Sequence, residues 1–226
     1  MTTATAPDLT LPEIGGSHHF LLRRLHSLTG ILFGLYVAFH LFINATIVEG
    51  GHVYQDQVDK IHALPFLLAV EWMTIYIPIL FHVIYGLWII FTGQPNNGSY
   101  PYFKNGFYLL QRVSAIILVG FIAFHVFSMK GLLGHVMAFN PHDANPTMIS
   151  GINAHWMVAW IVYPIGILAA CFHTANGFWT AAVSWGLTIS AAGQRRWGWV
   201  CVAVFFDMLI AGAIALAAVI VNGHPH

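Results

Sequence analysis

Four histidines of this sequence lie deep within strongly apolar stretches, one in each stretch. They are His40 in AFHLF, His82 in LFHVIYG, His125 in AFHVF and His173 in CFHTANG. An imidazole ring carries two polar nitrogens, and burying them without a partner costs free energy. Each ring must therefore hydrogen-bond to a neighbouring helix or bind a metal. For any one histidine taken alone, the two alternatives are about equally good.

The composition indicates a protein embedded in a membrane. Of the 226 residues, 58% are hydrophobic and only 7% are charged, whereas soluble domains carry about 25% charged residues. The formal net charge is zero, which argues against binding to nucleic acid. The two cysteines, Cys171 and Cys201, lie in apolar runs and indicate neither a disulfide framework nor a zinc site.

Five apolar runs are long enough to cross a bilayer, which takes roughly 20 residues of helix. They are too long and too uniformly apolar to be strands of a membrane barrel. We predict an all-α integral membrane domain of five transmembrane helices within residues 25–221, of which the first four form a bundle. A soluble arm, 1–24, precedes it and a short tail, 222–226, follows. The predicted spans are 25–48, 66–92, 107–131, 153–186 and 197–221.

The distribution of basic residues predicts the orientation of these spans. Basic residues favour the cytoplasmic side of a membrane. We therefore expect a multi-pass protein of the bacterial cytoplasmic membrane with a cytoplasmic N-terminus and an exoplasmic C-terminus. Lys60 and Lys130 fall on the outer side, and the other six basic residues fall on the inner side: Arg23, Arg24, Lys104, Arg112, Arg195 and Arg196.

The four histidines sort into two pairs by depth. At a rise of ~1.5 Å per residue, His82 and His173 lie about 15 and 20 Å from the cytoplasmic ends of their spans. By the same measure, His40 and His125 lie about 24 and 27 Å in. The sequence therefore predicts an inner pair, His82 with His173, and an outer pair, His40 with His125. Each pair draws on two different helices.

Two imidazoles that face each other from separate helices are suited to bind a haem iron, one on each side of the macrocycle. A flat macrocycle also favours small neighbours. Gly86 and Gly177 follow His82 and His173 by four residues, which places each glycine on the helical face of its histidine. The first four spans are thus expected to form a haem-binding bundle with two six-coordinate haems, which carry electrons and leave no open position for oxygen.

Other classes of protein compete with this interpretation. A haem-free channel or transporter with structural histidines is the alternative from a different class. A proton or ion pathway usually recruits carboxylates, and the spans hold only Glu71, near an end, and Asp207. A site for a metal ion alone is weaker still, because no cluster of histidine, cysteine and carboxylate residues converges in the sequence.

Longer motifs of the sequence carry a resemblance to a known family. The stretch RRLHSLTG leads to AFHLFIN, and LFHVIYGLWIIFTG, LLQRVSAIILVGFIAFH and FHTANGFWTAAVSWG follow. This pattern resembles the dihaem cytochrome b anchor subunits of succinate dehydrogenase and fumarate reductase. It is most similar to the single-subunit, five-helix anchors that work with menaquinone. The resemblance runs from about Arg23 to Gly186.

The resemblance implies both the ligands and the partners of the chain. The axial ligands of the family fall on His40, His82, His125 and His173, the same four residues that are paired above by their depth in the membrane. The implied cofactors are two haem b groups and menaquinone, with the quinone near the outer haem. The implied partners are an iron–sulfur subunit on the cytoplasmic side and the flavoprotein that holds the dicarboxylate site. The chain would be the electron-transfer subunit of a succinate:quinone oxidoreductase, or of a quinol:fumarate reductase, and would contain no dicarboxylate site itself.

Polar residues near the cytoplasmic ends of the spans are candidates to bind the haem propionates. Arg24, His26, Ser27 and Arg112 are placed for this role, and His26 and Ser27 match positions that face propionates in the family. The alternative for the arginines is contact with lipid phosphates or a purely topological role.

Glu71 is the candidate quinone residue. It precedes His82 by eleven residues, about 16 Å nearer the outer side, which places it just beyond the outer haem. A carboxylate there could take up a proton when a quinol is oxidised. The alternative is an ordinary acidic residue at the end of a helix.

Overall fold

The structure, a computed structural model, describes residues 17–93, 103–132 and 138–223 of the chain. Within these ranges it is helical and contains no strand. Five helical stretches are long and apolar enough to cross a membrane, so the predicted number of spans is confirmed. They are His19–Glu49, Leu67–Thr92, Gly106–Met129, Val158–Ser184 and Ala191–Asn222.

The first, third and fifth spans are each dominated by one α-helix. These are α1 (Ser17–Ala45), α5 (Phe103–Met129) and α8 (Ala191–Asn222). A helix satisfies its own backbone hydrogen bonds, which a chain surrounded by lipid requires. A 3-10 turn, η1 (Thr46–Glu49), extends α1.

The second and fourth spans each contain a π-helical segment. In the second, α3 (Leu67–Glu71) passes through η2 (Trp72–Tyr76) into α4 (Ile77–Thr92). In the fourth, η4 (Val158–Val162) passes into α7 (Tyr163–Ser184). Each π segment is followed by a proline in the first turn of the next helix, Pro78 or Pro164. Proline lacks an N–H group and collides with the carbonyl four residues earlier, and a wider turn accommodates this defect.

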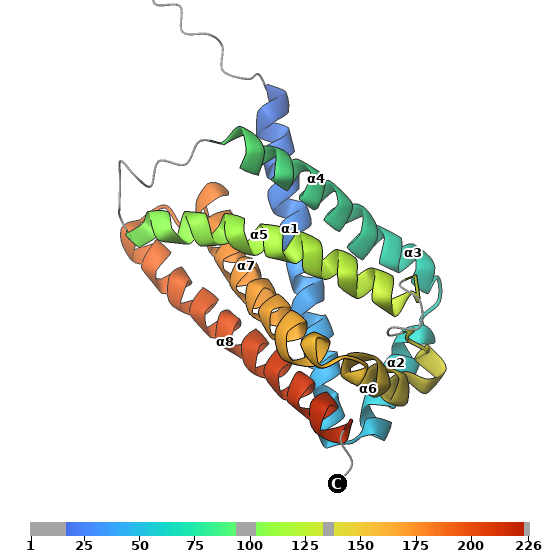
Figure 1. Ribbon diagram of the computed structural model, residues 1–226. Coiled ribbons are helices and arrows are strands. Elements are labelled where there is room, and N and C mark those ends of the chain that lie inside the picture. Colours follow the sequence, from blue (N-terminus) through green and yellow to red (C-terminus); the bar gives the residue numbers. More distant parts are fainter. Residues whose placement is uncertain (1–16, 94–102, 133–137, 224–226) are drawn as a thin grey trace, which may run out of the picture.

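The helices that hold the four histidines form two packed pairs. Helix α1 packs against α4, and α5 packs against α7. Contacts between α1 and α7 join the two pairs, and α8 packs along α7 and α1 (Figure 1). The fifth span thus closes one side of the bundle without contributing a histidine.

Two short helices outside the spans cover one end of the bundle, α2 (Gly51–His62) and α6 (Ala144–Asn153). The Gln55 side chain ties them together, since its amide donates to the Pro141 carbonyl and accepts from the Ala144 N–H, both at 2.8 Å. Tyr54 and Met148 are buried here in a hydrophobic cluster. The chain is therefore tightly packed at this end. We refer to it as the capped end, and to the other as the open end.

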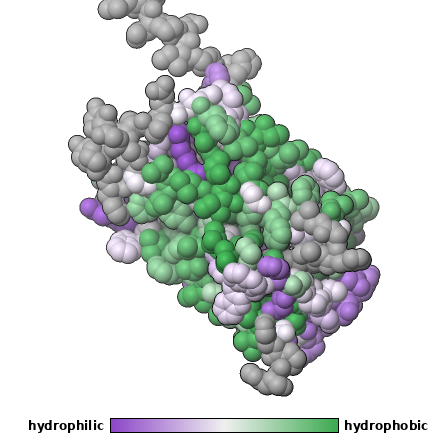
Figure 2. All heavy atoms as spheres, viewed as in Figure 1, coloured by the Kyte–Doolittle hydropathy of each residue, from purple (hydrophilic) through white to green (hydrophobic). Residues whose placement is uncertain are grey.

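The surface of the spans suits a bilayer. Hydrophobic residues cover the middle of the face seen in Figure 2, and hydrophilic ones gather mostly toward its ends. Exposed tryptophans, which favour membrane–water interfaces, occur near both ends of the bundle. They are Trp88, Trp185 and Trp199 at the open end, and Trp72, Trp156 and Trp160 at the capped end.

Some predicted bounds differ from the observed ones. Helix α1 begins at Ser17, so residues 17–24 of the predicted arm are helical, while residues 1–16 lie outside the described ranges. The fourth span begins at Val158 and the fifth at Ala191, five residues later and six residues earlier than predicted. Helix α8 ends at Asn222, and residues 224–226 of the predicted tail are not described.

Candidate functional site: a cavity between two pairs of histidines

A large cavity lies inside the bundle, between the α1–α4 pair and the α5–α7 pair. Its volume is about 1110 Å³, and the four candidate ligands His40, His82, His125 and His173 line it. Protein interiors otherwise contain few voids larger than a water molecule, and single-ligand pockets measure about 300–1,000 Å³. The cavity is therefore at least as large as the pockets that hold one sizeable ligand.

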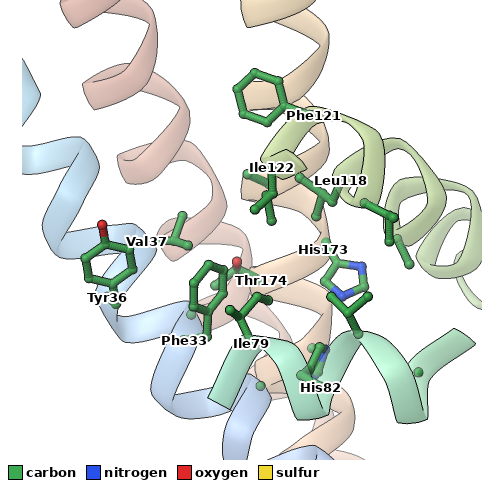
Figure 3. A pocket seen from close by; sticks show the side chains of 18 of the residues that line it. Phe33, Tyr36, Val37, Ile79, His82, Leu118, Phe121, Ile122, His173 and Thr174 are labelled. Atoms are coloured by element: carbon green, nitrogen blue, oxygen red, sulfur yellow. The ribbon is translucent and has the colours of Figure 1, made fainter. Parts of the chain in front are cut away.

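His82 and His173 face each other across this cavity. His82 lies on α4 and His173 on α7, and the labelled side chains of Figure 3 show the two rings next to each other. Their ring centroids are 6.2 Å apart and their planes are nearly perpendicular, at 88°. Two imidazoles bound to one metal through nitrogens about 2 Å from it have ring centres about 6 Å apart. The separation fits a shared metal atom.

His40 and His125 form the second pair. His40 lies on α1 and His125 on α5, and their ring centroids are 5.9 Å apart at an interplanar angle of 77°. Each pair thus takes one member from each of the two packed helix pairs. The structure therefore brings together the same two pairs of histidines that their depth along the spans predicts.

Hydrogen bonds at Nδ1 fix three of the four rings. In the tautomer that carries its proton on Nδ1, His82 donates to the carbonyl oxygen of His26 at 3.0 Å. His173 Nδ1 lies 3.3 Å from the Gln111 carbonyl oxygen and 3.2 Å from Ser114 Oγ. His125 Nδ1 lies 3.1 Å from the Tyr163 hydroxyl. A second partner of this kind is typical of metal-bound histidines, and it leaves Nε2 as the ligand atom.

His40 has a different neighbour. Its Nε2 atom lies 3.3 Å from the amide nitrogen of Asn44, which also donates to the His40 carbonyl at 2.7 Å. Asn44 lines the cavity as well. In this structure the amide of Asn44 therefore occupies the contact that a metal at His40 Nε2 would make, and binding there would require the amide or the ring to turn.

Glycines allow the helices and rings to approach closely around the first pair. A methyl group added at Gly30 of α1 would lie 2.5 Å from Cε1 of His82. One added at Gly86 of α4 would lie 3.1 Å from Cε1 of His26. Gly177 also lines the cavity, as its spacing from His173 suggests. Of Gly30 and Gly86, Gly30 has the closer contact, and that contact is to the candidate ligand His82.

Three of the four predicted propionate residues line the cavity toward the open end: His26, Ser27 and Arg112. The His26 ring stacks on His82 with centroids 4.0 Å apart, and its buried Nδ1 has no hydrogen-bond partner among the described residues. Ser27 Oγ accepts from the indole N–H of Trp185 at 3.0 Å. Arg112 contacts the Tyr108 hydroxyl.

Arg24 is the exception among these predicted residues. Its guanidinium lies 4.9 Å from the centre of the Phe20 ring and 4.8 Å from that of Trp185, and it is not part of the cavity lining. Arg23, one residue earlier, lines the cavity instead. A shift of one residue on a helix turns a side chain by about 100°, and sequence alone does not fix that rotation.

Glu71 lies near the capped end. It is the last residue of α3, and it lines the cavity together with Tyr36 and Tyr76. Tyr54 of α2 also reaches the cavity there, although it lies outside the spans. Burial raises the pKa of Tyr54 to about 12, so its hydroxyl stays protonated at neutral pH.

Three residues that contact the candidate ligands are not predicted from the sequence: Gln111, Ser114 and Tyr163. Ser114 and Gln111 carry a signal in the sequence, because they are polar residues within the apolar run LLQRVSAIIL. Tyr163 gives no such signal, because an aromatic residue in a span is most often part of the packing. No group of three or more histidine, cysteine and acidic residues arranged to hold a bare metal ion occurs in the described part of the chain.

These features define a multi-pass helical membrane protein whose interior is built around two facing pairs of imidazoles. No protein-family model matches the sequence. The chain is 32% identical over 207 residues to the succinate dehydrogenase cytochrome b558 subunit of Bacillus subtilis (strain 168), over 91% of this chain and 99% of that protein. The chain therefore belongs to the family of succinate dehydrogenase cytochrome b subunits, and the resemblance is confirmed.

Proposed function

We propose that this chain binds two haem b groups and carries electrons between an iron–sulfur subunit and menaquinone, as the membrane anchor of a succinate:menaquinone oxidoreductase. The observation that carries the proposal is the pair of ring separations, 6.2 Å for His82–His173 and 5.9 Å for His40–His125, within one cavity. His40, His82, His125 and His173 would hold the two haems, and bound haem would supply one-electron redox chemistry.

The residues around the cavity fit this cofactor. The Nδ1 contacts of His82, His125 and His173 hold the rings so that Nε2 is the free ligand atom. His26, Ser27 and Arg112 would bind propionates at the open end, where polar donors can meet anionic groups. Arg24 could join them only by leaving the Phe20 and Trp185 rings, so contact with lipid phosphate or the docked partner suits it better.

Glu71 would exchange protons with menaquinone near the capped end. Reducing a quinone takes up two protons and oxidising a quinol releases two, so a carboxyl group beside the quinone can serve either direction. The position of Glu71 in the cavity lining, on the far side of the outer histidine pair from the open end, supports this assignment. Tyr36 and Tyr76 line the same part of the cavity and offer hydroxyl groups for a quinone carbonyl.

The partner subunits would dock on the open end. This end carries most of the basic residues, which supports a cytoplasmic location by the positive-inside rule. We expect the iron–sulfur subunit to contact it and the flavoprotein to bind through that subunit. The N-terminus would be cytoplasmic and the C-terminus exoplasmic, with membrane lipid around the five spans. Dicarboxylate chemistry would belong to the flavoprotein, so this chain would be non-catalytic toward succinate.

The proposal is tested with the assembled complex in membranes. Addition of succinate should produce the absorbance of reduced b-type haem, and menaquinone should return the haem to its oxidised form. His82→Ala should abolish succinate-driven reduction of menaquinone, whereas His142→Ala, at an exposed histidine of the capped end, should leave it unchanged. A complex that oxidises quinol and reduces fumarate, but not the reverse, would favour the quinol:fumarate reductase alternative. A colourless preparation would favour the haem-free channel or transporter.

A further inference from the structure

We infer that Tyr163 is a positioning residue for His125: its hydroxyl oxygen accepts the Nδ1 proton of His125, fixes the ring and lowers the redox potential of the haem bound there. The inference rests on the proposed function, since it concerns a histidine that would bind haem. The first observation is the hydrogen bond, with 3.1 Å between His125 Nδ1 and the Tyr163 oxygen. The two rings lie 5.9 Å apart at 76°.

The surroundings of Tyr163 hold its ring in this place. Tyr163 is only 7% exposed. Phe121 packs edge-on against it, with centroids 5.5 Å apart at 90°, and also stacks on His125 at 5.8 Å and 20°. Gly166, one turn after Tyr163, makes room for Phe121, because a methyl group added there would collide with the Phe121 ring. The three rings therefore form one packed unit across α5 and α7.

The backbone explains how a residue of α7 comes to face α5 here. Tyr163 is the first residue of α7 and follows the π segment η4 (Val158–Val162) directly, with Pro164 next. A π segment adds a residue to a turn and so rotates the helical turns before it relative to those after it. Such segments often occur at functional sites. Because of this rotation, Tyr163 at the start of α7 is directed at the outer histidine pair.

The contact at His125 differs from those at the inner pair. His82 Nδ1 meets a backbone carbonyl, that of His26. His173 Nδ1 lies close to a backbone carbonyl as well as to Ser114 Oγ. At His125 the hydrogen bond described is to a side chain. A single substitution can therefore remove the acceptor at the outer pair while the carbonyl acceptors of the inner pair remain.

The hydrogen bond should change the electronic character of the ligand. An acceptor at Nδ1 makes an imidazole a more basic ligand. A more basic ligand stabilises ferric over ferrous iron, which lowers the redox potential. Tyr163 would thus make the outer haem a weaker oxidant than the same site without the hydroxyl group, and electron transfer to the quinone would be more favourable.

The test is a redox titration of the full chain carrying its haems, followed by optical spectroscopy. Tyr163→Phe keeps the ring and removes only the hydroxyl group, so one of the two haem components should move to higher potential. Ser114→Ala removes the hydroxyl beside the inner pair and serves as the matched control, since it should leave that same component in place. A wild-type chain without two haem components would contradict the proposed function. With both components present, an unchanged Tyr163→Phe titration, or equal shifts of both components, would overturn this inference.

A second pair of variants covers the case in which Tyr163→Phe does not retain two haems. Tyr163→Gln offers a carbonyl acceptor, and Tyr163→Leu offers none. Retention of both haems by the glutamine variant alone would support an acceptor at this position. Equal loss from both would show that Tyr163 acts only by filling space and would overturn the inference.

Discussion

The rings of His26 and His82 stack face to face, with centroids 4.0 Å apart and planes 11° apart, although they come from different helices. The same two residues share a hydrogen bond from His82 Nδ1 to the His26 carbonyl oxygen. His26 thus supports the candidate ligand in two ways, through its ring and through its backbone. Because only the ring contact depends on the side chain, the two contributions can be separated by substitution.

Replacing His26 with alanine should remove the stacking contact and keep the backbone hydrogen bond. Stacked rings are worth about 0.5–1.5 kcal/mol beyond the area they bury, so the variant should unfold at a lower temperature, and His26→Phe should recover most of the loss. Thermal unfolding followed by circular dichroism in detergent measures both. Equal melting temperatures for wild type and alanine variant would show that the stacking contributes nothing.

A methyl group at Gly30 should displace His82. Gly30→Ala places Cβ 2.5 Å from His82 Cε1, which is too close for the ring to stay where it is. We expect haem content to fall from two to one per chain, measured by absorbance of the purified protein. Gly120→Ala is the matched control, because a methyl group there meets nothing within 4 Å. Two haems in the Gly30→Ala chain would contradict the placement of His82 as a ligand.

Glu71→Gln should impair quinone chemistry and leave haem binding intact. A positioned proton donor or acceptor typically contributes 10²–10⁴-fold, so we expect menaquinone reduction by the complex to fall about a hundredfold. Asp56→Asn removes an exposed carboxylate of the same end and should have no effect. Full turnover in the Glu71→Gln complex would leave Glu71 as an ordinary acid at the end of a helix.

The buried hydroxyl of Tyr54 should make the capped end sensitive to alkaline pH. Burial raises its pKa from 10.0 to about 12, so the unfolded chain loses this proton at lower pH than the folded chain does. The corresponding stability is complete below pH 10 and is lost as the pH rises from 10 to 12. Tyr54→Phe has no proton to lose, so its unfolding free energy should fall less over this interval. Parallel decreases in the two proteins would contradict the burial of this hydroxyl.

The sequence predicts the spans and the histidine pairing because both depend on position along the chain. Apolar runs fix where helices cross the membrane, and the rise per residue fixes the depth of His82 and His173. The sequence does not predict the short helices α2 and α6, which lie between the expected spans. Their apolar faces are short, and they become recognisable when Tyr54 and Met148 pack together in three dimensions.

The direction of individual side chains could not be predicted in the same way. The cavity is lined by Arg23 and not by Arg24, which depends on the rotation of α1 about its axis. The role of Tyr163 depends on the π segment before it, and a π segment has no clear signature in the sequence apart from the proline that comes after it.

The two facing histidine pairs should hold two haems, which can be counted in the purified chain. Absorbance of the reduced pyridine complex, divided by protein concentration, should give two haem b groups per chain. The count should be lower in alanine variants of His40, His82, His125 and His173 and unchanged in His142→Ala. A wild-type chain without haem, or alanine variants that keep both haems, would contradict the account.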